Sequence, residues 1–229
     1  MYVAAIVVAA GSGRRLGAGV NKVLLPLAQR TILDRSVAAI SADSRVRSIR
    51  VVIRPEDDAD VRAALAAGRW PDLALVHGGK ERADSVRCGL TALDDRVQLV
   101  LVHDAARPLL PPRVLSAVID AGLAHGAAIP VVAVSDTLKR VQDGKVKETV
   151  DRSDLAAAQT PQAATLQRLR AAYARWPSPG PPPTDEAQVL ERAGVSIAVV
   201  AGDARNLKIT TAADLALAEF LCLRTEDAP

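Results

Sequence analysis

Short apolar runs alternate with amphipathic stretches along most of the chain. This alternation predicts an α/β fold, a mainly parallel sheet whose connecting helices cover its faces. With 229 residues, 49% of them hydrophobic, the chain is long enough to bury such a core. The predicted strands are residues 3–10, 49–53, 73–77, 99–103, 128–133 and 197–201. The predicted helices are residues 32–41, 56–67, 83–93, 112–125, 166–176, 185–192 and 212–223.

Residues 136–154 interrupt this alternation. Segments 137–141 and 145–150 flank Asp143-Gly144, and an Asp-Gly pair between alternating segments predicts a β-hairpin. Its faces are mostly polar, so it would be marginal alone, and packing on another subunit would explain its presence. We therefore expect an α/β core over residues 1–135 and 159–229, with a protruding β-arm over residues 136–158.

The charge composition argues against a nucleic-acid partner. The net charge is +3, from 29 basic and 26 acidic residues that are interspersed along the chain, and aromatic residues make up 2%. Few side chains could therefore stack on bases, although a small anionic ligand remains possible. No apolar run has the length of a membrane span, and the first ten residues lack the basic start of a signal peptide. We expect a cytoplasmic protein without a membrane partner.

A glycine-rich segment, Ala9-Ala10-Gly11-Ser12-Gly13-Arg14-Arg15-Leu16-Gly17, follows the first predicted strand. Glycines let the backbone approach a ligand and aim consecutive N–H groups at an anion. Leu16 stands where a dinucleotide-binding fingerprint needs glycine, and the segment lacks the Gly-Lys-Ser/Thr of a P-loop. Arg14, Arg15 and Lys22 add positive charge, which favours a triphosphate. The alternative is a turn with solvated arginines.

Three further clusters contain candidate ligand-binding residues. Residues 78–85 lie between a strand and a helix, where the backbone and Ser85 could read a base edge, or Ser85 could simply start the helix. Asp104 ends an apolar strand, and ligands bind at that end of open α/β sheets. It can hold a ribose hydroxyl or Mg²⁺, or cap a turn, whereas His103 has no accompanying nucleophile and is expected to be structural. Lys208 precedes a capped helix at the same edge, although a solvated lysine is the alternative.

In order along the chain, these residues resemble the 2-C-methyl-D-erythritol 4-phosphate cytidylyltransferase family. The resemblance covers nearly the whole sequence. Its matching elements are residues 9–15, Asn21-Lys22, residues 79–85, residues 103–108, Asp136-Thr137, Asp151-Arg152, Gln159-Thr160-Pro161-Gln162, Thr184-Asp185-Glu186 and residues 206–208. Three positions depart from the family pattern: Asn21 replaces a common proline, Val23 a frequent glutamine, and Lys80 a different residue.

The resemblance implies a Rossmann-like nucleotidyltransferase core that forms a homodimer through the arm. Its members join CTP to 2-C-methyl-D-erythritol 4-phosphate and release diphosphate, in the non-mevalonate pathway of isoprenoid synthesis. The implied cofactor is Mg²⁺, held mainly by the CTP phosphates, and no residue of the chain is expected as a metal ligand.

The resemblance also implies a role for individual residues. The implied catalytic residues are Arg15, Lys22, Arg152 and Lys208. The triphosphate would be held by Ala9, Ala10, Gly11, Ser12 and Gly13. Gly79 and Ser85 would recognise cytosine, and Asp104 and Ala105 the ribose. The acceptor phosphate would be held by Lys208 of one subunit together with Arg107, Thr137, Arg152 and Thr160 of its neighbour.

Two other functions fit much of the same pattern. A cytidylyltransferase for another polyol phosphate, such as ribitol 5-phosphate, would use a very similar set of loops and differ in its acceptor contacts. A non-catalytic nucleotide-binding regulator on the same fold should lack lysines at the reacting phosphate, yet Lys22 and Lys208 are both present.

Overall fold

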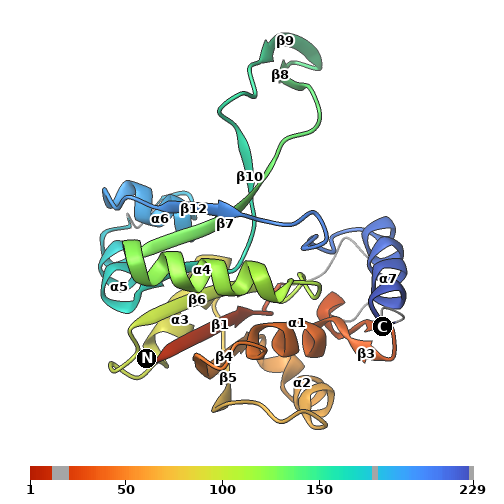
Figure 1. Ribbon diagram of the computed structural model, residues 1–229, viewed down its shortest axis with the longest axis vertical. Helices are drawn as coiled ribbons and strands as arrows, with labels where there is room; N and C mark the ends of the chain where they lie inside the picture. Colours follow the sequence, from red (N-terminus) through yellow and green to blue (C-terminus); the bar gives the residue numbers. More distant parts are fainter. Residues whose placement is uncertain (12–20, 177–179, 227–229) are drawn as a thin grey trace.

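An eight-stranded sheet forms the centre of the molecule (Figure 1). The computed structural model describes residues 1–11, 21–176 and 180–226. The strands are β1 (Val3–Val8), β4 (Val46–Ile53), β5 (Leu73–His77), β6 (Leu99–Asp104), β7 (Ala127–Ala133), β10 (Ala156–Ala158), β11 (Gln162–Thr165) and β12 (Ala198–Ala201). They are ordered β10-β7-β11-β6-β1-β4-β5, and β12 also pairs with β7. The predicted α/β class with a mostly parallel sheet is confirmed.

The order of the sheet reverses at β1. This strand pairs in parallel with β4 on one side and with β6 on the other. Val8 is in register with both Val52 and Asp104, so the three strands end at one edge of the sheet. A ligand crevice is expected where neighbouring parallel strands lead away in opposite directions.

Helices cover both faces of the sheet. They are α1 (Ile32–Ser41), α2 (Asp58–Leu65), α3 (Arg82–Thr91), α4 (Pro112–His125), α5 (Leu166–Arg175) and α6 (Glu186–Arg192), whereas α7 (Ala212–Glu226) lies to the side of the sheet (Figure 1). In β1, Val3, Ala5 and Val7 pack with α1, α2 and α4, whereas Ala4 and Ile6 pack with α3, α5 and α6. The alternation of side chains along the strand thus supplies two hydrophobic cores.

Two antiparallel strands were not predicted from the sequence. Strand β11 lies between β6 and β7 and is antiparallel to both, and β10 pairs with β7. Their sequences, Ala156-Ala157-Ala158 and Gln162-Ala163-Ala164-Thr165, are rich in alanine, a poor strand former. Pairing with strands already in the sheet therefore determines their conformation.

Some element boundaries differ from those predicted. Strand β1 ends at Val8, two residues before the predicted end. The helix predicted over residues 56–67 is divided into a 3-10 turn, η3 (Pro55–Asp57), and α2. The remaining short elements before α1 are η2 (Lys22–Leu24), β2 (Pro26–Leu27) and β3 (Arg30–Thr31).

The predicted hairpin is present and stands away from the sheet (Figure 1). It consists of β8 (Leu138–Gln142) and β9 (Lys145–Val150), which pair only with each other among the described strands. Asp143 and Gly144 have φ values of 51° and 71°, as a two-residue hairpin turn requires. The division at residues 136 and 158 stays a prediction, and within that range β10 already pairs with β7.

Helix α7 attaches the end of the chain to the β2–β3 segment. A third hydrophobic cluster joins Leu27 of β2 and Ile32 of α1 to Ala218 and Cys222 of α7, with Ile209 between them. This packing positions the loop that carries Lys208.

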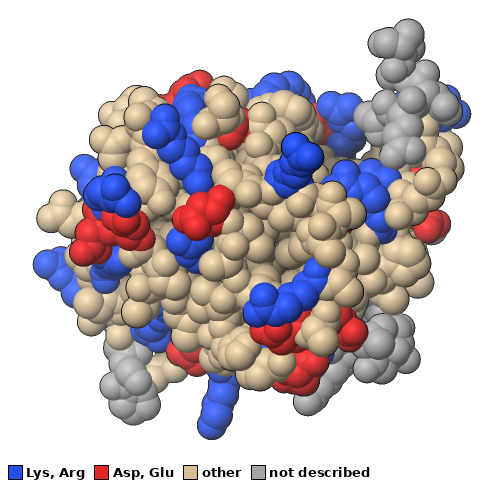
Figure 2. Space-filling model, turned by 90° about the horizontal axis from the view of Figure 1, so that it is seen from below, with Lys and Arg blue, Asp and Glu red and all other residues tan. Residues whose placement is uncertain are grey.

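The charges are distributed over the surface. On the face in Figure 2, basic and acidic residues lie among one another, as their interspersed positions in the sequence suggest. Among the described helices, none combines the length and the apolar character that crossing a bilayer requires.

Candidate active site

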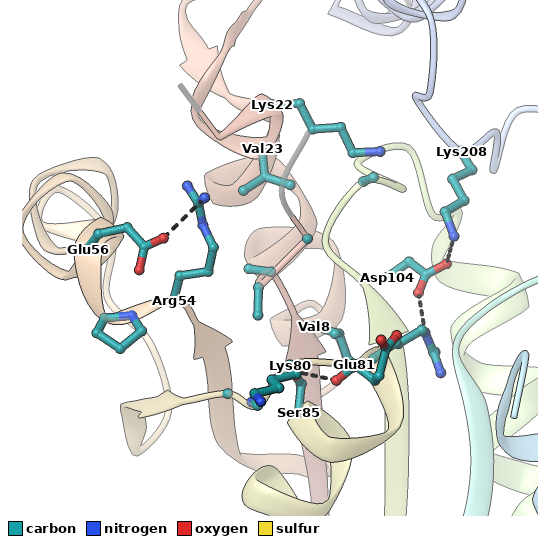
Figure 3. A pocket seen from close by; sticks show the side chains of 18 of the residues that line it. Val8, Lys22, Val23, Arg54, Glu56, Lys80, Glu81, Ser85, Asp104 and Lys208 are labelled. Carbon is teal, nitrogen blue, oxygen red and sulfur yellow. Dashed lines mark hydrogen bonds and ion pairs between the residues drawn. The ribbon is translucent and has the colours of Figure 1, made fainter. Parts of the chain in front are cut away.

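A cavity of about 740 Å³ opens where β1 and β6 end (Figure 3). Its cationic lining residues are Lys22, Arg54, Lys80, Arg82 and Lys208, and its acidic lining residues are Glu56, Glu81 and Asp104. Figure 3 shows Lys22 and Lys208 on one side of the cavity, with Arg54 and Glu56 on the other. Cations outnumber carboxylates among these described residues, so the cavity favours an anion.

The loop after β1 reaches into this cavity. Ala9, Ala10 and Gly11 line it, and the Ala9 N–H donates to the Val52 carbonyl at 2.8 Å. A Cβ atom at Gly11 would meet nothing within 4 Å, so the backbone is open to a ligand there. Three predicted site residues of this loop, Ser12, Gly13 and Arg15, lie outside the described residues.

Lys22 is held at the cavity by the residue before it. The Asn21 side chain is 1% exposed, and its Nδ2 donates to the Ala9 carbonyl (2.9 Å) and to Asp57 Oδ2 (2.8 Å). Its Oδ1 caps η2. Lys22 Nζ donates to the Ile209 carbonyl at 3.0 Å. Asn21, a departure from the family pattern, thus joins the segment that carries Lys22 to the end of β1.

The Asp104 carboxylate, at the end of β6, faces cations from two other segments. Lys208 Nζ lies 2.8 Å from its Oδ2, and Arg82 Nε lies 3.3 Å from its Oδ1. Burial acts to raise the pKa of Asp104, but the positive charges of Arg82 and Lys208 outweigh it and hold the pKa well below its usual range. Asp104 is therefore an ionised acceptor at neutral pH.

A buried hydrogen-bond chain supports the backbone of Asp104. His103 Nε2 lies 3.0 Å from the Arg107 carbonyl, which can only accept, so Nε2 carries the proton. His103 Nδ1 then accepts from Thr160 Oγ1 (3.0 Å), which in turn accepts from the Asp104 N–H (3.1 Å). Burial lowers the pKa of His103 to about 4, so the ring is neutral and structural.

Ser85 fixes the turn that borders the other side of the cavity. Its hydroxyl donates to the Glu81 carbonyl at 3.2 Å and accepts from the Gly79 N–H at 3.3 Å. A Cβ atom at Gly78 would lie 2.6 Å from Ser85 Oγ, and one at Gly79 would lie 2.4 Å from Asp84 Cβ. Only glycine fits at both positions, and the turn lies against the cavity, where Gly79 and Ser85 are lining residues.

Other predicted site residues lie behind the cavity or away from it. Ala105 is fully buried, and its neighbour Ala106 lines the cavity instead. Thr160 is also buried, and Arg107 donates from NH1 to the Asn206 carbonyl at 2.6 Å. Burial lowers the pKa of Arg107.

Thr137 and Arg152 lie exposed at the base of the arm. Arg152 NH1 donates to the carbonyls of Val134 (3.0 Å) and Ser135. Neither residue is part of the cavity lining in its own chain.

The sequence analysis missed two cations of the cavity. Arg54 directly follows β4, and its Nε and NH2 donate to the two carboxylate oxygens of Asp57 at 2.8 and 2.7 Å. Arg82 begins α3 and contacts Asp104. Because Arg54 follows an apolar strand, the rule that identified Asp104 could have identified it too.

Comparisons with known proteins identify the family of the chain. The sequence model of the family described as "IspD: 2-C-methyl-D-erythritol 4-phosphate cytidylyltransferase" matches residues 3–224. The protein of that name from Frankia casuarinae is 45% identical over 228 residues, 99% of this chain and 83% of the relative. The protein from Saccharopolyspora erythraea, with the same name, is 44% identical over 225 residues, 96% of this chain and 98% of the relative.

A solved structure shares the fold over nearly its whole length. The 4-diphosphocytidyl-2C-methyl-D-erythritol synthase from Anaerococcus prevotii superposes with a TM-score of 0.85 and 28% sequence identity. The match covers 97% of this chain and 96% of that one. From the family match and these relatives, the chain belongs to the 2-C-methyl-D-erythritol 4-phosphate cytidylyltransferase family.

Proposed function

We propose that the cavity binds CTP and transfers its cytidylyl group to 2-C-methyl-D-erythritol 4-phosphate. The products are 4-diphosphocytidyl-2-C-methyl-D-erythritol and diphosphate, in the non-mevalonate pathway of isoprenoid synthesis. Membership of the family makes the chain a nucleotidyltransferase. The observation that supports this cavity as the site is the convergence of Lys22 and Lys208, far apart in the sequence, beside the glycine-containing loop after β1.

The proposed reaction is an in-line displacement at the α-phosphorus of CTP. A phosphate oxygen of the acceptor forms a bond to that phosphorus, the bond to the bridging oxygen breaks, and diphosphate leaves. Negative charge grows on the α-phosphate and on the leaving group. Lys22 and Lys208 line the cavity where they can neutralise that negative charge, and Arg15 is expected to stabilise it as well. No covalent enzyme intermediate is needed.

The same cavity offers separate contacts for the triphosphate, the base and the sugar. Backbone N–H groups after β1 would hold the triphosphate. The turn of Gly79 and Ser85 would read the cytosine edge, and the ionised Asp104 would accept from ribose hydroxyls. These residue roles stay predictions.

We propose that Mg²⁺ is bound mainly by the phosphate oxygens of CTP. Asp104 already faces Arg82 and Lys208, cations that would repel a divalent ion, so we assign its carboxylate to the sugar. The described residues contain no group of three or more histidines, cysteines, aspartates or glutamates placed to hold a metal. When bound, the ion would neutralise triphosphate charge. Turnover that persists in excess chelator would contradict this requirement.

We also propose a homodimer in which each site is completed by the partner's arm. Thr137 and Arg152 lie outside the cavity of their own chain, and Val141 and Val146 of the hairpin are more than 60% exposed. A second copy would cover these valines and receive the two polar residues near its acceptor phosphate. The cytoplasmic location stays a prediction.

Diphosphate release with different substrates tests the assignment. We expect release with CTP and 2-C-methyl-D-erythritol 4-phosphate, and far less when UTP replaces CTP, because a mismatched base leaves buried polar groups unpaired. Comparable rates with ribitol 5-phosphate would favour the polyol-phosphate alternative. CTP binding without release for any acceptor would favour a regulator.

A further inference from the structure

A buried carboxylate lies behind the cavity and contacts its lining. Glu186, the first residue of α6, is 1% exposed and is not a lining residue. Its Oε1 and Oε2 accept from Arg82 NH1 and NH2 at 2.7 and 2.9 Å, and Tyr173 donates its hydroxyl to Oε1 at 3.0 Å. A charge buried this deeply is tolerated when it is paired in such a two-point geometry.

Arg82 connects this carboxylate to the cavity. Two of its nitrogens are bound by Glu186, and the third, Nε, lies 3.3 Å from Asp104 Oδ1. Because the guanidinium is planar, the pair with Glu186 fixes the direction of the Nε–H group. Arg82 thus makes one long contact with Oδ1 of Asp104, and Lys208 contacts Oδ2 at 2.8 Å, so the carboxylate keeps further lone pairs for the cavity.

The start of α6 is itself fixed by the sheet. Gln162 of β11 is 2% exposed; its Nε2 donates to Asp185 Oδ2 at 3.0 Å and its Oε1 accepts from the Ala187 N–H at 2.9 Å. These bonds hold both neighbours of Glu186. Residues 159–162 and 184–186 are among the elements that resemble the family, and the resemblance implies no role for Gln162 or Glu186.

We propose that Glu186 is a positioning residue for recognition of the nucleotide sugar. It acts through Arg82, which orients the Asp104 carboxylate toward the ribose hydroxyls. This inference rests on the assignment of Asp104 to the ribose in the proposed function. Without Glu186, two N–H groups of Arg82 lose their acceptor, and Asp104 is the carboxylate that the same guanidinium already contacts. Arg82 would then pair with Asp104 and compete with the hydroxyls.

The test compares CTP with 2′-deoxy-CTP in the full-length Glu186→Gln enzyme. We expect kcat/KM for CTP to fall about tenfold, because a charge-assisted bond is lost, and kcat/KM for 2′-deoxy-CTP to fall less. The ratio of kcat/KM for CTP to kcat/KM for 2′-deoxy-CTP, which measures the preference for the ribonucleotide, would therefore decrease. Glu191→Gln, an exposed position on the same helix, is the matched control and should leave both values unchanged. An equal fall for both nucleotides, or no fall, would show that Glu186 has only a structural role.

Asp104→Asn, measured in parallel, separates this inference from the proposed function. If Asp104→Asn leaves the preference unchanged, the ribose assignment is wrong and the inference falls with it. If Asp104→Asn narrows the preference and Glu186→Gln does not, only the positioning role is wrong. Absence of transfer from CTP by the unaltered enzyme would contradict the proposed function itself. If Glu186→Gln does not fold, Arg82→Lys serves as the second variant, because a lysine cannot contact both Glu186 and Asp104. The ratio of kcat/KM for CTP to that for 2′-deoxy-CTP is then compared in the same way.

Discussion

The ammonium group of Lys208 lies 2.8 Å from the carboxylate of Asp104, which joins the loop before α7 to the end of β6. Lys208 is 42% exposed, whereas Asp104 is 11% exposed. The lysine is therefore held over the cavity while part of its side chain remains open to a ligand. This pairing suggests that Lys208 is placed before the substrate arrives.

Replacing Lys208 by alanine should impair chemistry more than folding. Removing one donor that stabilises transition-state charge typically lowers kcat by about 10²–10³. Asp104 keeps its contact with Arg82, so the fold should be retained. Steady-state kinetics and thermal unfolding measure both effects. Arg96→Ala, which breaks an exposed ion pair with Asp94, is the control and should alter neither. An unchanged kcat in Lys208→Ala would mean that Lys208 does not stabilise charge in the transition state.

Mixing two inactive homodimers should restore activity if the arm completes the partner's site. Lys208→Ala damages the cavity, and Arg152→Ala damages the arm. With random pairing about half of the dimers are mixed, and each mixed dimer has one intact site, so about a quarter of the original activity should return. Co-refolding followed by diphosphate-release assays measures this recovery.

The opposite geometry gives a different result. If each arm served its own chain, both sites of a mixed dimer would keep one lesion. Mixed dimers identified by mass spectrometry yet lacking activity would exclude the shared site, while leaving the cytidylyltransferase assignment intact.

His103 should make the protein more stable as pH rises from 5 to 7.5. Burial lowers its pKa to about 4, below the usual 6.5, so between these two pH values the unfolded chain binds a proton that the folded chain does not. The free energy of unfolding should therefore be about 2 kcal/mol smaller at pH 5. Urea unfolding at the two pH values measures this difference. The free energy of unfolding of His103→Gln should depend less on pH. If it depends on pH as strongly as that of the unaltered protein, other groups cause the effect.

The turn between β2 and β3 should be stabilised by glycine. Ala28 and Gln29 have φ values of 43° and 63°, a region that residues with a side chain rarely adopt. Gln29→Gly should raise the free energy of unfolding by about 0.5 kcal/mol, as relief of strain exceeds the added chain entropy. Gln29→Val should lower it, because a β-branched residue fits this region worst. Urea unfolding of the two variants measures both changes. A higher free energy of unfolding in Gln29→Val would mean that the turn is not strained.

The sequence predicted the elements that bury large apolar side chains. β4, β6 and α4 each have a clear apolar pattern, and the Asp143-Gly144 pair identified the hairpin. β10 and β11 could not be found in this way, because alanine carries little strand signal and only their pairing with β7 and β6 makes them strands.

The candidate site was predictable where a residue follows a strand. Asp104 and the loop after β1 were recognised by that position. The partnership of Arg82 and Glu186 was not, because 104 residues separate them and only the folded chain brings the two helix starts together. The same holds for Thr160, whose hydroxyl group supports the Asp104 backbone rather than pointing into the cavity.

The hydrogen bond from Lys22 to the Ile209 carbonyl spans 187 positions of the chain. During synthesis on the ribosome, the strands β1, β4, β5 and β6 emerge long before the segment that carries Lys208 and Ile209. The nascent chain can therefore gather much of its hydrophobic interior while the cavity still lacks one wall. Contacts this distant in sequence form late in folding. The full lining of the cavity can therefore assemble only after residue 209 has been synthesised.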